Sequence, residues 1–228
     1  MHSTRMAIAV DGPAASGKSS TAKAIARRLG FRHVDSGALY RAATAARVRA
    51  GGSAETWTEQ SVLDAARIVR LEPTDVGFTA LLDGLPADEE MRGDKVTRNV
   101  SRVASMPAVR EWVNSQVRKA AEEHDVVVDG RDIGTVVFPD AALKVYLVAD
   151  QDERARRRLL ERAHRPPTAD EIAEEARRIV RRDELDAAQS APAPDAVLID
   201  TTYLAQSEQI ERIAALAEAA RRAAALRR

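Results

Sequence analysis

The sequence predicts an α/β fold with three layers, in which helices cover both faces of a parallel sheet. Five short apolar runs rich in β-branched residues alternate with segments that have helical spacing, and four of these runs lead directly into an aspartate. Strands that are apolar at every position and alternate with helices are typical of a buried parallel sheet. We expect the five strands at residues 6–10, 31–34, 126–128, 143–148 and 197–199.

The segments after the first and last strands predict helices that pack on this sheet. Apolar residues between Ala22 and Leu29 repeat with helical spacing, and Gly30 stands where a left-handed C-terminal cap is expected. The chain ends in a second amphipathic pattern, for which Ser207 is the expected N-cap.

Two long excursions divide the chain into parts. Roughly 90 residues separate the second and third strands, too many for a simple crossover. We expect helices at residues 59–70 and 107–123 there, and a small β insert around residues 77–82 with a hairpin turn at Asp83-Gly84. Residues 152–189 predict a charged helical hairpin, broken at Pro166-Pro167. The single unit, residues 1–228, thus comprises a core (about 5–58, 124–151 and 190–228), an insert (about 59–123) and a lid (about 152–189).

Composition excludes several classes of protein. The 228 residues are 45% hydrophobic and carry 35 basic and 35 acidic side chains, which argues against a disordered chain. No run approaches the length of a membrane span, and the zero net charge argues against unspecific attraction to nucleic acid or membranes. The absence of cysteine excludes disulfides and thiolate zinc sites and, with no signal peptide, predicts a cytoplasmic location. Arginine makes up 30 of the 35 basic residues, which reflects either genome composition or phosphate binding.

A glycine-rich loop follows the first predicted strand and leads into the first predicted helix. It matches the pattern G-x-x-x-x-G-K-[ST], in which backbone N–H groups surround phosphate oxygens. Within it, Lys18 is expected to reach the β- and γ-phosphates and Ser19 to offer its hydroxyl to Mg²⁺. The residues expected to bind ATP here are Gly12, Pro13, Ala14, Ala15, Ser16, Gly17, Lys18, Ser19 and Ser20.

The remaining sequence favours a small-substrate kinase among the proteins with such a loop. A regulatory GTPase needs an Asn-Lys-x-Asp guanine reader, and neither Asn99 nor Asn114 is followed by lysine. Transfer to an acceptor phosphate brings two anions together, so the site needs several cations. The arginines of the charged excursions are candidates for that role.

The sequence resembles the bacterial cytidylate kinases, which are nucleoside monophosphate kinases with a P-loop fold. The resemblance covers nearly the whole chain and rests on residues 11–20, residues 35–41 (Asp-Ser-Gly-Ala-Leu-Tyr-Arg) and residues 129–140, which begin Asp-Gly-Arg-Asp. A weaker block contains Arg182-Asp183 and Asp186. The resemblance implies a five-stranded parallel sheet with a mobile helical lid and an acceptor-binding insert. It also implies transfer of the γ-phosphoryl group of ATP to CMP or dCMP, with Mg²⁺, by a monomer.

The family's functional residues are implied at the matching positions. Ser36, Arg41 and Arg131 are implied to bind the acceptor phosphate, and Asp132 to accept from the cytosine amine, with Ser101 and Arg110 at the O2/N3 edge. Arg182 and Asp186 resemble the lid-side pair that meets the acceptor. The implied catalytic residues are Lys18, Arg131 and Arg182.

Three points stay open at this stage. Either Arg157 or Arg158 is expected to reach the donor phosphates. Asp35 and Asp129 are candidates to hold Mg²⁺ through water or to orient Lys18, or they only cap the turns that follow.

The third point is a departure from the family pattern. Many members of the family carry an arginine where this chain has Gln189, so Arg181 or another lid residue compensates, or the acceptor binds less tightly. The alternatives to a CMP kinase are a kinase for UMP or another small acceptor, and a non-catalytic nucleotide-gated binding module.

Overall fold

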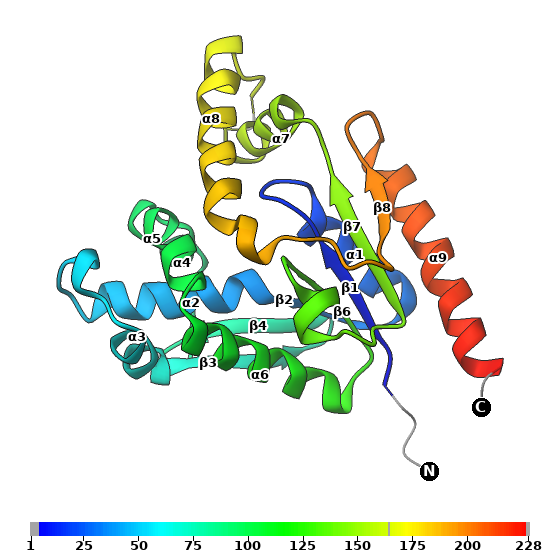
Figure 1. Ribbon diagram of the computed structural model, residues 1–228, viewed down its shortest axis with the longest axis horizontal. Helices are drawn as coiled ribbons and strands as arrows, with labels where there is room; N and C mark the ends of the chain where they lie inside the picture. Colours follow the sequence, from blue (N-terminus) through cyan, green and yellow to red (C-terminus); the bar gives the residue numbers. More distant parts are fainter. Residues whose placement is uncertain (1–4, 164, 227–228) are drawn as a thin grey trace.

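The centre of the computed structural model, which describes residues 5–163 and 165–226, is a sheet with the strand order β3-β4-β2-β6-β1-β7-β8 (Figure 1). The five strands from β2 to β8 in this order are parallel to their neighbours and are the five that the sequence predicts. The strand bounds are β1 Ala7–Asp11, β2 Arg32–Asp35, β3 Val69–Thr74, β4 Gly77–Leu82, β5 Leu85–Pro86, β6 Val126–Gly130, β7 Leu143–Val148 and β8 Val197–Asp200.

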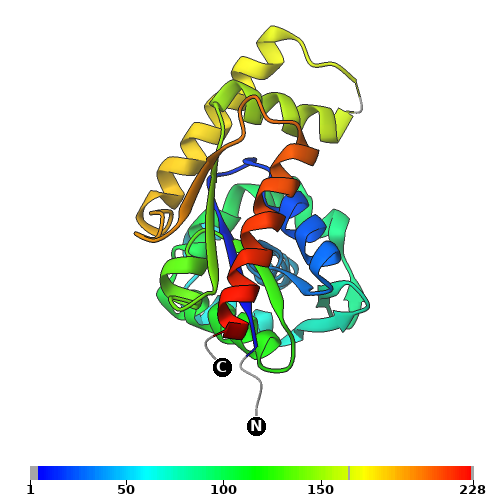
Figure 2. The same cartoon turned by 90° about the vertical axis from the view of Figure 1, so that its right-hand side faces the viewer.

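Helices cover both faces of the sheet, as the sequence predicts. Ile8 and Val10 of β1 point into a cluster with α1 and α9, whereas Ala9 between them belongs to a cluster with α2, α3 and α6. Because successive strand residues point to opposite faces, burial on both sides explains why these strands are apolar throughout. Figure 2 shows α1 and α9 together on one face. The helix bounds are α1 Lys18–Leu29, α2 Ser36–Arg49, α3 Glu59–Ala65, α4 Asp88–Arg92, α5 Asp94–Ala104, α6 Pro107–Glu123, α7 Gln151–Ala163, α8 Ala169–Asp186 and α9 Gln206–Leu226.

The insert is more closely joined to the sheet than the sequence suggested. Strands β3 and β4 form an antiparallel hairpin, and β4 adds to the edge of β2 where Gly77 lies opposite His33. A Cβ at Gly77 would come within 2.5 Å of the His33 carbonyl oxygen, so only glycine allows the two strands to approach. With β5, which pairs with β4, the sheet has eight strands rather than five.

Two predictions within the insert have different outcomes. The hairpin turn at Asp83-Gly84 is confirmed, with φ values of 55° and 76° that suit a two-residue turn between β4 and β5. The helix predicted at residues 59–70 is too long, because α3 ends at Ala65, and after a short 3₁₀ turn the chain enters β3 at Val69. All residues of β3, from Val69 to Thr74, pair with β4, and Pro73 could not continue a helix.

The charged excursion forms the predicted helical hairpin, made of α7 and α8, which stands above the sheet in Figure 1. Thr168 and Glu171 begin α8 with reciprocal side-chain to backbone hydrogen bonds, which fix the start of the helix directly after Pro166-Pro167. The two helices pack on each other, and Ala155 and Ile179 are fully buried in the small cluster between them.

The two predicted helix caps also have different outcomes. Gly30 ends α1 with the expected left-handed conformation, at φ 70°. Ser207 is not the N-cap of α9, because this helix begins at Gln206 and Ser207 lies inside it. The backbone N–H of Ala205 donates instead to the carboxylate of Glu208 at 3.0 Å, and this bond anchors the first turn.

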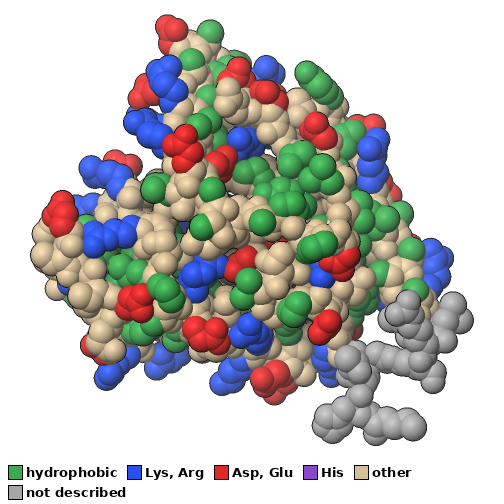
Figure 3. Space-filling view, viewed as in Figure 1, with side chains coloured by type: hydrophobic (Ala, Val, Ile, Leu, Met, Phe, Trp, Pro, Cys, Tyr) green, Lys and Arg blue, Asp and Glu red, His purple; other side chains and the backbone are tan. Residues whose placement is uncertain are grey.

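The balanced charge of the sequence is visible on the surface. On the face shown in Figure 3, basic and acidic side chains are interspersed, including over the lid helices. Many of them form exposed ion pairs, such as Arg178 with Glu174 along one face of α8. Within residues 5–163 and 165–226, no helix combines the length and the apolar character that a membrane span requires.

Candidate active site

A cavity of about 1030 Å³ opens between the core, the insert and the lid. Parallel strands β1, β2 and β6 all end at it, which is where ligands bind in open α/β sheets. The cavity is lined by most of the residues predicted for the site: Ala14, Ala15, Ser16, Gly17, Lys18, Ser19, Ser20, Asp35, Ser36, Arg41, Ser101, Arg110, Asp129, Arg131, Asp132, Arg157, Arg158, Arg182 and Asp186.

The phosphate loop connects β1 to α1 as the motif requires. Gly12 has a φ of 155°, and a Cβ there would collide with the carbonyl oxygen of Leu147, so the tight turn depends on glycine. Gly12 and Pro13 do not line the cavity. They contribute through their carbonyl oxygens, which accept from Arg131 at 3.1 Å and from the Nζ of Lys18 at 3.0 Å.

The loop carries the features of an anion site. The Oγ of Ser16 is buried with no hydrogen-bond partner among the described residues, although it lies where phosphate oxygens are expected. Burial lowers the pKa of Lys18 to about 7, and the nearby positive charge of Arg131 is the second cause. Lys18 is thus buried beside a second cation, and a bound polyphosphate would stabilise its positive charge.

Hard oxygen ligands gather beside this loop. Ser19 donates its hydroxyl to Asp129, whose other oxygen lies 2.7 Å from Nε2 of His33. Asp35 accepts from the backbone N–H of Ala38 at 3.1 Å, so it does cap α2. Burial and then the neighbouring Asp129 raise the pKa of Asp35, which indicates two carboxylates held close together.

These residues fit Mg²⁺. It prefers oxygen ligands and keeps several waters while it binds one or two carboxylates and the phosphates of a substrate. Within the part of the chain that the structure describes, no group of three or more His, Cys, Asp or Glu side chains could hold a metal. Ser19, Asp35 and Asp129 offer one hydroxyl and two carboxylates, a set of oxygen ligands that suits a partly hydrated ion shared with a nucleotide.

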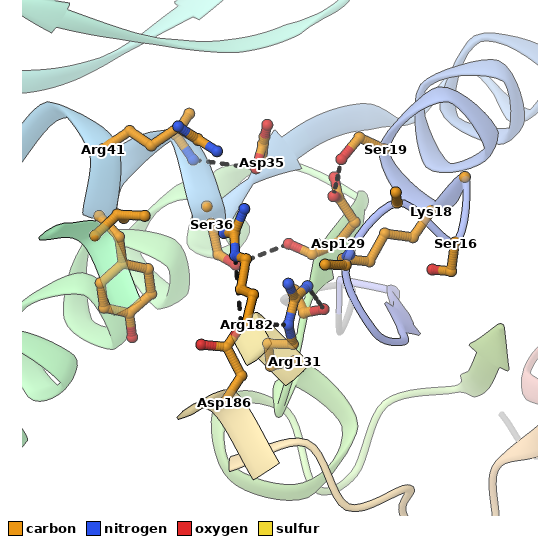
Figure 4. A pocket seen from close by; sticks show the side chains of 18 of the residues that line it. Ser16, Lys18, Ser19, Asp35, Ser36, Arg41, Asp129, Arg131, Arg182 and Asp186 are labelled. Atoms are coloured by element: carbon orange, nitrogen blue, oxygen red, sulfur yellow. Dashed lines mark hydrogen bonds and ion pairs between the residues drawn. The ribbon is translucent and has the colours of Figure 1, made fainter. Parts of the chain in front are cut away.

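Four cationic side chains come together from distant parts of the chain. Figure 4 shows Lys18, Arg131 and Arg182 lying together in the cavity beside Asp129, with Arg41 on α2 near Asp35. Arg131 donates to Asp186 at 3.2 Å, and the Nε of Arg182 lies 3.8 Å from the same carboxylate. This arrangement brings the predicted Arg131, Arg182 and Asp186 into one cluster.

Two arginines of this group, Arg182 and Arg41, lack full compensation. Burial lowers the pKa of Arg182 to about 9, with the charge of Arg131 as the next cause. Burial lowers the pKa of Arg41 to about 10, with Arg92 as the next cause. The Nε of Arg182 is buried with no hydrogen-bond partner among the described residues. Ser36, which donates to the carbonyl of Asp129 at 2.8 Å, lines the same space.

The far end of the cavity carries the predicted base readers. Arg110 forms an ion pair with Asp132 and donates to the carbonyl of Ala104 at 3.0 Å. Ser101 of α5 is buried and lines the cavity with them. A fixed carboxylate only accepts hydrogen bonds, so Asp132 suits a ligand that presents an amine.

A buried aspartate that sequence reasoning did not assign holds this end in place. The carboxylate of Asp11 accepts from the backbone N–H groups of Ile133 at 2.9 Å and Gly134 at 2.8 Å. Burial raises the pKa of Asp11 to about 6 in spite of these two bonds. Because Asp11 ends β1 directly before the phosphate loop, it ties the Asp132 turn to that loop.

Arg157 and Arg158, between which the sequence does not decide, both line the cavity. They bind different partners. Arg157 donates to the carbonyl of Thr201 at 2.6 Å and to the Thr201 hydroxyl at 3.1 Å, which ties it to the loop after β8. Arg158 pairs at 3.2 Å with Glu175, a carboxylate buried between the lid helices. Arg157 thus lies at the loop after β8, and Arg158 between the lid helices.

Gln189 lines the main cavity, as its place in the family pattern implies. Arg181, named as a candidate to replace the missing arginine, lines only a side cavity between α5 and α8. Arg158 and Arg162 line both cavities, so they are better placed than Arg181 to supply positive charge.

Sequence reasoning missed a contact between the lid and the phosphate loop. Arg154 donates to the Ala14 carbonyl at 3.0 Å and to Asp183 at 2.5 Å, and Asp183 also accepts from the Ala14 N–H at 2.9 Å. Arg154 is buried, although it stands in a charge run that normally indicates a solvated helix face. The place of Asp183 in the weaker motif block was the one available signal.

A family model described as cytidylate kinase matches residues 8–219. A cytidylate kinase of Geobacillus kaustophilus is 45% identical over 217 residues, which cover 92% of this chain and 95% of the relative. One from Rhodococcus opacus is 40% identical over 220 residues, which cover 93% and 95%. Among solved structures, a shikimate kinase from Bacteroides thetaiotaomicron matches with a TM-score of 0.48 and 16% identity, over 93% of this chain and 98% of that one.

Proposed function

Because the chain belongs to the cytidylate kinase family, we propose that it transfers the γ-phosphoryl group of ATP to CMP or dCMP. The products are ADP and CDP or dCDP, which places the chain in pyrimidine nucleotide metabolism. The observation that carries this proposal is that one cavity contains the phosphate loop, the Asp132–Arg110 pair and the cations Lys18, Arg131 and Arg182.

The reaction needs an oxygen of the acceptor phosphate to attack the γ-phosphorus in line with the leaving oxygen. That oxygen is already anionic at neutral pH, so no general base is needed. The chain has to hold two phosphate groups in line and to offset their repulsion. Lys18, Arg131 and Arg182 supply that positive charge without a covalent intermediate. Burial, and then the neighbouring charge of Arg131, lower the pKa values of Lys18 and Arg182, and bound anions would stabilise both positive charges.

The donor lies on the phosphate loop, residues 12–20, with Arg157 or Arg158 reaching its phosphates from the lid. Ser19, and through water Asp35 and Asp129, would hold Mg²⁺, which would supply positive charge beside the phosphates of the donor. Ser16 satisfies its buried hydroxyl on the same phosphates, which accounts for the missing partner.

The acceptor lies across the cavity from the loop. Its phosphate is bound by Ser36, Arg41 and Arg131, while Arg182 and Asp186 meet it from the lid side, with Asp186 accepting from ribose hydroxyls. Asp132 accepts from the N4 amine of cytosine, and Ser101 and Arg110 bind the O2/N3 edge. Uracil presents an acceptor at position 4, which would face the carboxylate of Asp132 and be rejected.

The three parts of the chain divide this work. We assign acceptor binding to the insert and closure over the two nucleotides to the lid, because the cavity is lined from all three parts. A single chain is enough to line the whole cavity, so a monomer is the proposed working form. Since both substrates are cytoplasmic metabolites, we place the reaction in the cytoplasm.

A coupled assay of ADP release tests the proposal, with CMP, dCMP, UMP, AMP and shikimate as acceptors in parallel. We expect ADP release with CMP and dCMP, far less with UMP, and none with shikimate. A preference for UMP would replace the proposal by a UMP kinase. ADP release that does not depend on any acceptor, or no release at all, would favour a nucleotide-gated binding module.

A further inference from the structure

His33 holds one oxygen of the Asp129 carboxylate from outside the cavity. Its Nε2 lies 2.7 Å from Oδ1 of Asp129, whose other oxygen accepts from the Ser19 hydroxyl (Figure 4). An ionised carboxylate only accepts hydrogen bonds, so the proton of the histidine contact lies on Nε2. Among the described residues, Ser19 and His33 are the side chains that donate to this carboxylate. Because His33 does not itself line the cavity, it can act on a ligand there only through Asp129.

The register of the sheet explains why His33, Asp129 and Ser19 meet. Asp35 of β2 lies opposite Asp129 of β6, and His33 precedes Asp35 by two residues, so all three side chains point to the same face of the sheet. Val127, two residues before Asp129, packs against α1 on that face. Ser19 stands in the first turn of α1, and the helix therefore brings its hydroxyl to the same carboxylate.

The backbone of His33 is held by strands on both sides. It lies opposite Val127 of β6 and opposite Gly77 of β4, the strand that joins the insert to the sheet. A Cβ at Gly77 would come within 3.0 Å of the His33 backbone nitrogen, so β4 packs directly against this residue. The side chains of His33 and Asp129 are 13% and 2% exposed, so little water competes for the bond between them. The orientation of the Asp129 carboxylate thus depends on a histidine that the sheet holds in place.

We propose that His33 is a positioning residue for Mg²⁺, which keeps the Asp129 carboxylate in the orientation that binds the ion through water. This inference rests on the proposed function and deepens it by a residue outside the cavity. A carboxylate oxygen has two acceptor sites, so each oxygen of Asp129 can accept from its protein partner and from one water of the ion. Without the imidazole the carboxylate is free to rotate. Groups that orient a metal ligand typically contribute about tenfold to hundredfold in metal affinity.

The variants His33→Leu and His33→Gln test this together. Leucine fills similar space and donates no hydrogen bond, whereas the amide of glutamine can still donate to Asp129. In His33→Leu we expect the concentration of free Mg²⁺ that gives half-maximal turnover to rise about tenfold, while the KM for CMP stays within about twofold. His33→Gln should return this Mg²⁺ concentration to within about threefold of the wild-type value.

A second measurement needs no turnover. The increase in melting temperature that ADP causes is measured with Mg²⁺ and with EDTA, and the difference between the two reports the bound ion. This difference should become smaller in His33→Leu and return in His33→Gln, while the increase with EDTA stays the same in both. If His33→Leu does not fold, His33→Phe, which also lacks a donor, replaces it. His124→Ala is the matched control, because it removes another partly buried histidine that packs on Phe78 of β4, and it should leave the difference unchanged.

Two results would overturn the inference. One is an unchanged Mg²⁺-dependent difference in His33→Leu, and the other is a failure of His33→Gln to restore it, since packing alone would then explain the residue. A wild-type chain that shows the difference but transfers no phosphoryl group to CMP contradicts the proposed function alone, and the two variants still decide the role of His33. ADP release with CMP, but no Mg²⁺-dependent difference in the wild type, contradicts the inference alone.

Discussion

The carboxylate of Asp183 accepts a hydrogen bond at 2.9 Å from the backbone N–H of Ala14, so lid helix α8 is bonded directly to the phosphate loop. Arg154 completes the contact, since it donates to the Ala14 carbonyl and to Asp183. Ala14 of the phosphate loop is thus held by lid residues through both its N–H and its carbonyl group. The lid therefore influences how the loop is oriented before ATP arrives.

The variant Asp183→Ala should break the contact between lid helix α8 and the phosphate loop. It removes both bonds of the carboxylate and leaves Arg154 buried without its ion pair, so we expect the free energy of unfolding to fall by about 2 kcal/mol. The KM for ATP should rise about fivefold, measured in steady-state kinetics. Asp170→Ala, at an exposed position on the same helix, is the control and should change neither value. A normal KM for ATP in Asp183→Ala would show that the contact is not needed to orient the loop.

The variant Lys18→Met should lower kcat about a hundredfold or more, because it removes positive charge where negative charge develops in the transition state. Steady-state turnover with CMP measures this. Lys23→Met, on the exposed side of the same helix, should keep normal turnover. A rate near that of the wild type in Lys18→Met would remove the phosphate loop lysine from the mechanism.

Binding of ATP should be accompanied by proton uptake above neutral pH. The free protein holds the pKa of Lys18 at about 7, so at pH 8 most of the population carries a neutral lysine. A bound triphosphate favours the charged form and raises this pKa, so protons are taken up at pH 8 and not at pH 6, where the lysine is already charged. Calorimetry of MgATP binding in two buffers with different ionisation enthalpies measures the uptake. Equal uptake in Lys18→Met would assign it to another group.

The variant Asp132→Ala should weaken the discrimination between cytosine and uracil. Loss of the carboxylate removes the acceptor for the cytosine amine, so kcat/KM for CMP should fall at least about tenfold. The ratio of kcat/KM between CMP and UMP should narrow, because the repulsion against uracil is also lost. Asp140→Ala, at an exposed position a few residues further along the chain, is the matched control. Unchanged discrimination in Asp132→Ala would refute its role as base reader.

Gln189→Arg should improve binding of the acceptor. Gln189 lines the cavity close in sequence to Asp186, so a new guanidinium there adds a charge-assisted bond to the phosphate. We expect the KM for CMP to fall about threefold to tenfold, with kcat unchanged. Gln206→Arg adds the same charge elsewhere in the cavity and should leave this KM unchanged. A KM for CMP that does not fall would show that the existing lid arginines already fill this role.

The features that could be predicted are those that depend on residues close together in the sequence. The five parallel strands follow from apolar runs that end in aspartate, since both faces of each strand are buried. The phosphate loop follows from glycines and Lys18 at fixed spacing. The grouping of Ser36, Arg41, Arg131, Asp132 and Arg182 around one cavity came instead from the family resemblance, and the structure brings them together there.

Features that depend on pairs far apart in the chain could not be predicted. The bond between Ala14 and Asp183 spans 169 residues, and no local pattern distinguishes the buried Arg154 from exposed arginines beside it. The unpaired hydroxyl of Tyr40 has no local signal either, because the missing partner is a property of its surroundings among the described residues. The early end of α3 likewise depends on the pairing of β3 with β4, which tertiary contacts decide.

The joining of β4 to β2 at His33 and Gly77 should also lower the tendency of the protein to aggregate. Without the insert, β2 would be an open edge of the sheet, with unpaired backbone groups ready to pair with another chain. The hairpin moves that edge outward to β3, where Pro73 lacks an N–H and Arg70 and Glu72 add charge. The segment that we assign to acceptor binding therefore also keeps neighbouring molecules from adding strands to the sheet.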